Sequence, residues 1–191
     1  MASAKTKLIL VRHGETAANR EGRFAHSDDI PLNEEGNLQA LRVAEQLAAG
    51  HSPQRIISSP FARARQTAAI IAERFGLPVE TAVDLRERNF GMLRGRAYEQ
   101  MGRLMLSDPA YDPAAHWFWA PQGGESLHDV QSRVVAAIET IAARYTGEEI
   151  VVVTHGAVME SVAAHLAGDW AKAAVPVNCG TVILEYPIIT R

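Results

Sequence analysis

Two histidines, His13 and His155, occupy matching positions at the ends of two apolar runs. His13 closely follows residues 7–11 (Lys-Leu-Ile-Leu-Val), and His155 follows residues 150–153 (Ile-Val-Val-Val); each precedes a glycine and a predicted helix. Such runs predict buried strands. Since sites in open α/β sheets lie at the carboxyl ends of strands, we expect both imidazoles to face one crevice. A single histidine is more often a surface or core residue, so it is the matched pair that indicates a site.

The neighbours of His13 favour phosphate chemistry. Arg12 supplies a guanidinium, a helix beginning just beyond the histidine supplies backbone N–H groups, and Asn19 supplies a side-chain amide. Together these groups suit a bound phosphate. An imidazole nitrogen can attack phosphorus and give a phosphoramidate, which water hydrolyses, while an acceptor such as a backbone carbonyl keeps the other ring nitrogen protonated. Fixed positive groups can neutralise the transferred oxygens, so this route predicts no metal and no cofactor.

The elements that position these residues alternate along the chain. The sequence predicts an α/β fold with a mainly parallel sheet in a single domain over residues 1–191. Residues 97–122, which mix glycine, proline and aromatic residues, are expected to leave the sheet as an excursion with helical pieces. Strands are predicted at residues 7–11, 55–58, 78–81, 150–153 and 181–186, and helices at 33–50, 60–75, 126 onward and 158–166.

Composition excludes several classes of protein. The chain has 191 residues, 47% of them hydrophobic, and a formal net charge of −3, which indicates a globular protein and does not favour a nucleic-acid binder. A single cysteine, Cys179, rules out an intramolecular disulfide, and no apolar segment has the length of a membrane helix or the character of a signal peptide. We therefore expect a cytoplasmic protein, monomeric or homodimeric, with no membrane partner. Arginine makes up sixteen of the nineteen basic residues, which suits phosphate recognition or reflects a compositional bias.

The run Arg-His-Gly-Glu-Thr at residues 12–16, with Asn19, resembles the signature of the histidine phosphatase superfamily, the phosphoglycerate mutase-like proteins. Further blocks resembling this family follow in order at residues 31–36, 58–68, 85–91, 123–126, 153–156 and 178–181. One Arg-His-Gly triplet is weak evidence, but all the blocks in order are a specific signal. The resemblance implies a three-layer α/β/α sandwich and a histidine acid-type phosphatase, a phosphoric monoester hydrolase.

The resemblance also implies roles for individual residues. His13 matches the nucleophile that becomes phosphohistidine. Glu87 matches the general acid that protonates the leaving oxygen and then deprotonates the attacking water, and a bound phosphate dianion favours its protonated form. With His155, these are the catalytic residues that the resemblance predicts. The transferred phosphate is expected to contact Arg12, Gly14, Asn19, Arg63 and His155.

Departures from the family pattern fall on the substrate side. Ala25 and His26 stand where small residues are usual, and Arg94 replaces an acid. These three residues are a possible rim for an acidic substrate, but His26 and Arg94 can equally point to solvent. The aromatic run Trp117, Phe118 and Trp119 can wall the leaving-group side or pack the excursion, and we favour packing.

The segment between the loop that carries Glu87 and the helix that begins near Ser126 is short, which favours a hydrolase over a mutase. Mutases of this family carry a longer, more basic insertion there, whereas residues 91–124 contain only Arg94, Arg96 and Arg103 as permanent cations. We therefore expect a phosphomonoesterase that acts on a small phosphorylated metabolite. A phosphoglycerate mutase and a phosphoprotein phosphatase are the alternatives. A non-catalytic phosphate binder is disfavoured, because binding alone needs none of the three predicted catalytic residues.

Overall fold

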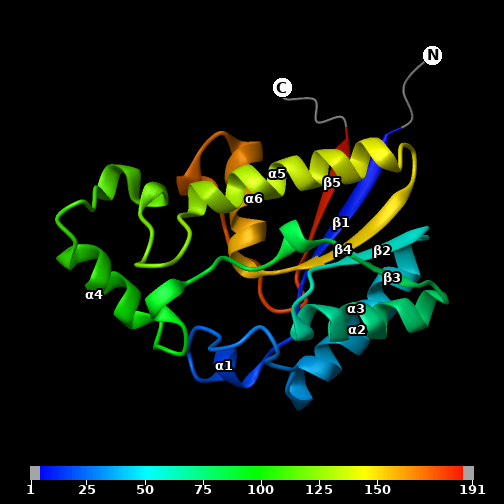
Figure 1. Ribbon diagram of the computed structural model, residues 1–191. Helices are drawn as coiled ribbons and strands as arrows, with labels where there is room; N and C mark the ends of the chain where they lie inside the picture. Colours follow the sequence, from blue (N-terminus) through cyan, green and yellow to red (C-terminus); the bar gives the residue numbers. More distant parts are fainter. Residues whose placement is uncertain (1–4, 187–191) are drawn as a thin grey trace.

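A five-stranded sheet forms the centre of the computed structural model, which describes residues 5–186 (Figure 1). The strand order is β3-β2-β4-β1-β5; the first four strands are parallel and β5 is antiparallel to β1. The mainly parallel sheet predicted from the sequence is thus confirmed. The strands are β1 (Thr6–Arg12), β2 (Arg55–Ser58), β3 (Val79–Thr81), β4 (Glu149–Thr154) and β5 (Thr181–Tyr186).

Two pairs of helices cover the two faces of this sheet and complete the expected three layers (Figure 1). The helices α2 (Glu34–Gly50) and α3 (Ala62–Phe75) pack on one face, against residues such as Ile9 and Val151. The helices α5 (Leu127–Arg144) and α6 (Gly156–Ala167) pack on the other, against Leu8 and Val152. Alternate residues of β1 and β4 thus point into opposite cores, so the central residues of both strands, 8–11 and 150–153, are all apolar. No helix within residues 5–186 is long and apolar enough to cross a membrane.

Helix termini follow local chemistry. The Asn33 side chain accepts a hydrogen bond from the Gly36 N–H at 2.8 Å and caps α2 as predicted, and Ser126 caps α5 with Asp129 in a reciprocal capping box. The prediction that α3 begins at Pro60 was early by two residues. Phe61 is extended, and its N–H donates to the Ser59 hydroxyl at 3.3 Å, so the helix begins at Ala62.

Residues 97–122 leave the sheet as predicted. They contain α4 (Glu99–Ser107), which buries no residue, and the 3-10 helix η3 (Pro113–Phe118). The expected packing of the aromatic run is correct only in part. The Trp117 ring stacks parallel to the Trp170 ring with centroids 6.1 Å apart, but Phe118 is exposed and Trp119 lines the central cavity described below. The remaining short pieces are α1 (Ala17–Arg20), η1 (Val83–Leu85), η2 (Gly91–Leu93) and η4 (Trp170–Lys172).

Candidate active site

The two strand-end histidines face each other. Strands β1 and β4 are adjacent and parallel, with Arg12 in register with Thr154, so the next residue of each strand emerges at the same edge. The rings of His13 and His155 meet edge to face with centroids 5.1 Å apart. His13 is 3% exposed and His155 is fully buried. The expected shared crevice is therefore present.

The hydrogen bonds of His13 define its tautomer. Arg63 donates from Nε to His13 Nε2 at 3.2 Å, and a guanidinium can only donate, so Nε2 must be an acceptor. The proton then lies on Nδ1, which donates to the Gly14 carbonyl at 2.7 Å. Burial, followed by the charge of Arg63, holds the pKa of His13 well below its usual 6.5. The result is a neutral imidazole whose Nε2 lone pair points toward the guanidinium, as the nucleophile role requires.

His155 is held from the opposite side. Its Nε2 lies 2.6 Å from the Ser59 hydroxyl, which follows strand β2 at the same sheet edge. Its Nδ1 is buried and has no hydrogen-bond partner among the described residues. Burial, followed by the charge of Arg63, holds the pKa of His155 well below 6.5. When the Ser59 hydroxyl donates to Nε2, the Nδ1–H is free to donate to a ligand.

Two arginines surround His13. Arg63, in the first turn of α3, is 3% exposed, and Arg12, the last residue of β1, donates from Nη1 to the Pro176 carbonyl at 2.6 Å. The Arg63 Nη1 and Arg12 Nε atoms are buried without a partner in the part of the chain that the structure describes. Buried N–H groups are rarely left unpaired in proteins. With the Nδ1 of His155 they form a set of donors suited to an anion.

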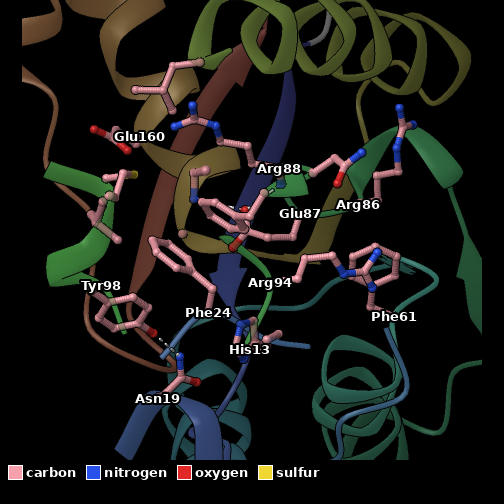
Figure 2. Close-up of a pocket in the computed structure, with 18 of the residues that line it drawn as sticks. His13, Asn19, Phe24, Phe61, Arg86, Glu87, Arg88, Arg94, Tyr98 and Glu160 are labelled. Carbon is pink, nitrogen blue, oxygen red and sulfur yellow. Dashed lines mark hydrogen bonds between the residues drawn. The ribbon is translucent and has the colours of Figure 1, made fainter. Parts of the chain in front are cut away.

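Glu87 lies on the loop after η1 and faces the same cavity (Figure 2). Its Oε1 accepts hydrogen bonds from the Arg88 N–H at 2.9 Å and from the Ala157 N–H, in the first turn of α6, at 3.2 Å. Helix N-terminal N–H groups lack partners within their helix, so they are available to hold a carboxyl oxygen in place. One carboxyl oxygen is thereby fixed, while the other has no hydrogen-bond partner within residues 5–186 and can exchange a proton.

Arg133 fixes the loop that carries Glu87. Its guanidinium donates to the carbonyls of Asp84 at 2.7 Å, Arg86 at 2.8 Å and Glu87 at 3.2 Å. It also pairs with the Glu125 carboxylate at 2.9 and 3.1 Å. An arginine from α5 therefore determines the path of the acid loop, although neither Arg133 nor this pairing with Glu125 was predicted from the sequence.

Asn19 and Gly14, both expected to contact phosphate, form hydrogen bonds to other residues of the protein. Asn19 lines the cavity, but its Oδ1 caps α1 through the Thr16 N–H, and its Nδ2 donates to the Tyr98 hydroxyl at 3.2 Å (Figure 2). The Gly14 N–H, expected to contact phosphate, instead donates to the Thr67 hydroxyl at 3.0 Å, and Gly14 does not line the cavity. Gly14 therefore contributes through its carbonyl, which holds the proton of His13.

The cavity has a volume of about 520 Å³. Of the three predicted rim residues, Ala25 and Arg94 line it, and Arg94 also pairs with Asp28 at 2.9 Å. His26 is exposed and lies outside the lining, so the alternative that it points to solvent is correct. Within residues 5–186, no three histidine, cysteine or acidic side chains are grouped to hold a metal ion.

Several site residues were missed from the sequence. Ser59 directly follows the predicted strand at residues 55–58, so its place at the same sheet edge was a usable signal. Arg88 and Glu160 also line the cavity, and Tyr98 joins it from the start of the excursion (Figure 2). The positions of these three residues depend on how loops and helices pack against one another, and no local sequence pattern predicts that packing.

Comparisons with known proteins agree with this geometry. The sequence model of the histidine phosphatase superfamily (branch 1) matches residues 8–187. The chain is 39% identical over 158 residues to phosphoglycerate mutase-like protein 4 of Arabidopsis thaliana, covering 82% of this chain and 69% of that protein. It is 36% identical over 162 residues to the metal-independent phosphoserine phosphatase of the same plant, covering 84% and 68%.

Among solved structures, a mycobacterial glucosyl-3-phosphoglycerate phosphatase in complex with VO3 superposes with a TM-score of 0.80 at 30% identity, covering 93% of this chain and 90% of that one. A phosphoserine phosphatase from Entamoeba histolytica in complex with 3-phosphoglyceric acid gives a TM-score of 0.77 at 28% identity, covering 93% and 89%. The sheet and helices described above are therefore shared with solved phosphatases.

Proposed function

Because the chain belongs to the histidine phosphatase superfamily, branch 1, we propose that it is a phosphomonoesterase that hydrolyses a small phosphorylated metabolite through a phosphohistidine at His13. The observation that carries the proposal is the fixed tautomer of His13, whose Nε2 lone pair faces Arg63. Buried donors of Arg12, Arg63 and His155 that have no partner within residues 5–186 accompany it. Relatives that bear the names of phosphoserine and glucosyl-3-phosphoglycerate phosphatases support a small substrate. A cavity of about 520 Å³ with aromatic walls also suits a small molecule.

Phosphate binding comes first in this proposal. The phosphoryl oxygens take the unpaired N–H groups of Arg12, Arg63 and His155, with Asn19 assisting from the edge of the cavity. The hydrogen bond from Arg63 Nε to His13 Nε2 is then exchanged for one to a phosphoryl oxygen, which frees the lone pair. Two arginines supply the positive charge and the neutral imidazole of His155 a hydrogen bond to the transferred group, so no metal ion or cofactor is needed in this mechanism.

The first transfer forms an N–P bond and breaks the P–O bond of the ester. The Nε2 lone pair attacks phosphorus, and the ester oxygen leaves with the bonding electrons while Glu87 gives it a proton. The Gly14 carbonyl holds the Nδ1 proton and favours the positive charge that the ring acquires. The alcohol then departs.

The second transfer reverses these roles with water. The Glu87 carboxylate removes a proton from a water molecule as its oxygen attacks phosphorus, and the N–P electrons return to Nε2. Inorganic phosphate leaves, and both His13 and Glu87 regain their starting protonation states. Atoms and charges balance over the two steps, and no redox partner is needed.

The test is a panel of phosphomonoesters assayed for phosphate release in buffer with a metal chelator. His13→Ala should abolish release, whereas His165→Ala, an exposed histidine on α6, should leave it unchanged. Glu87→Gln should retain substrate binding and reduce kcat by about 10²-fold or more. Release that survives His13→Ala, or that the chelator removes, would overturn the mechanism. Interconversion of 2- and 3-phosphoglycerate faster than phosphate release would identify a mutase instead.

A further inference from the structure

The cavity also has apolar side chains in its lining, among them Met101 and Met105 of α4 and Leu127 of α5. The carboxylate of Glu160, on α6, lines the same cavity. In Figure 2, Glu87 lies between His13 on one side and Arg88 and Glu160 on the other. The phosphate end and the Glu160 end are therefore on opposite sides of the acid that protonates the leaving oxygen.

Helix α6 determines the depth of Glu160. The Ala157 N–H in its first turn holds Glu87, and Glu160 comes three residues later on the same face. Three residues of α-helix span about 4.5 Å along the axis. Since the charge of Glu87 also acts on Glu160, we expect a short substituent on the leaving group, a carbon or two beyond the ester oxygen, to come near the Glu160 carboxylate.

The Glu160 carboxylate has no partner within residues 5–186: no side chain there lies within hydrogen-bond or ion-pair distance of it. Burial and the neighbouring charge of Glu87 raise the pKa of Glu160, and the cation of Arg88 acts in the opposite sense. Arg88 forms no ion pair with it. The Arg88 guanidinium is tied by Nε to the Glu125 carbonyl at 2.7 Å and by Nη2 to the Trp119 carbonyl at 3.1 Å.

A carboxylate accepts hydrogen bonds and donates none, and a half-buried one gains most from a cationic donor. We propose that Glu160 determines leaving-group specificity by accepting a hydrogen bond from an ammonium group on the substrate alcohol, and that it disfavours a leaving group that places a carboxylate there. This inference rests on the proposed function, because it takes phosphate at His13 and the ester oxygen at Glu87. Arg88 remains beside Glu160 as a fixed cation, so removing the Glu160 charge should reverse the preference toward carboxylates.

The experiment uses three phosphate esters of similar size that differ in one group: 2-aminoethyl phosphate, ethyl phosphate and carboxymethyl phosphate. The wild type should hydrolyse the aminoethyl ester with a kcat/KM about 10- to 100-fold above that of ethyl phosphate, the ratio for one hydrogen bond to a charged group. Glu160→Gln should remove this advantage, leave ethyl phosphate within about twofold, and raise the rate for the carboxymethyl ester. The matched control Glu73→Gln removes an exposed glutamate of α3 and should change none of the three rates.

Calorimetric binding of the same esters to a His13→Ala variant, with and without Glu160→Gln, separates this inference from the proposed function. Preferential binding of the aminoethyl ester that depends on Glu160, without turnover by the wild type, would support the specificity and refute the phosphatase mechanism. Equal binding of all three esters, or an equal loss for all three in Glu160→Gln, would overturn the inference even if the wild type hydrolyses them.

Discussion

The burial of two neutral histidines should make the stability of this protein depend on pH in a defined way. His13 and His155 have pKa values held well below 6.5, mainly by burial, whereas in the unfolded chain each should titrate near 6.5. Between pH 7.5 and 5.5 the unfolded chain therefore binds more protons than the folded one. The free energy of unfolding must then fall as the pH falls through this window.

The magnitude follows from the unfolded pKa alone while the folded histidines stay neutral. Each histidine should reduce the free energy of unfolding by about 1.4 kcal/mol between pH 7.5 and 5.5, so the pair contributes about 2.7 kcal/mol. Carboxyl groups that change pKa on folding also contribute, including Glu160, whose raised pKa acts in the opposite direction. Their contributions are shared by the wild type and by histidine variants, and they cancel when the two are compared.

Urea unfolding at the two pH values measures this quantity directly. The loss of unfolding free energy on going from pH 7.5 to 5.5 should be about 1.4 kcal/mol smaller in His155→Gln than in the wild type, and about 2.7 kcal/mol smaller in a variant that combines it with His13→Asn. Exposed His165 replaced by Gln serves as the control and should leave the pH dependence unchanged. If the wild type and the double variant lose the same free energy, the two imidazoles are not held neutral, and the nucleophile assignment built on that tautomer is wrong.

Three further substitutions test the supports of the site. Gly14→Ala should lower stability by about 1–3 kcal/mol in thermal unfolding, because a Cβ there would overlap the Gly36 carbonyl; Gly50→Ala, where a Cβ meets nothing within 4 Å, should not destabilise, and equal effects would refute the steric argument. Arg133→Met removes the donor to three loop carbonyls and one of the partners of Glu125, which keeps Arg86 and the Asn89 N–H, so we expect a loss of about 1–3 kcal/mol in urea unfolding and a larger effect on kcat than on KM; an unchanged kcat would show that Arg133 does not position Glu87. Arg63→Lys keeps the charge but removes the planar pair of donors, and steady-state kinetics should show kcat/KM reduced about 10²- to 10³-fold; a change below tenfold would contradict the phosphate role of that guanidinium.

The sheet and the histidine pair were predictable because their signals are local. An unbroken apolar run such as residues 150–153 fits only a strand covered on both faces, and a following glycine and helix mark its carboxyl end. Asn33 and Ser126 likewise mark the starts of their helices, because each side chain accepts a hydrogen bond from a backbone N–H only three residues further on. The bounds of β2 and β5 also match the prediction, because the residues that define these strands are adjacent in the sequence.

The features that could not be predicted from the sequence depend on contacts between segments that are far apart in the chain. The Glu87 loop is held by Arg133, some 46 positions away, and nothing in a helix pattern distinguishes that arginine from an exposed one. In the sequence, Glu160 is indistinguishable from an ordinary polar residue of a helix. Its place in the cavity depends on how α6 packs in the fold. The phosphate contact expected of Gly14 failed because its N–H is taken by Thr67 on α3, a helix that approaches it only in three dimensions.

The central claim is that His13 Nε2 becomes phosphorylated during turnover. The most direct measurement mixes the enzyme with an ester that it hydrolyses and quenches the reaction rapidly in alkaline denaturant. Mass spectrometry of the peptides then locates the phosphate. The Glu87→Gln variant is measured in parallel, because it should slow the hydrolysis of the intermediate. We expect an acid-labile phosphate on the peptide that carries His13 and none in His13→Ala. Phosphate on another residue, or turnover with no phosphorylated enzyme in either protein, would contradict it.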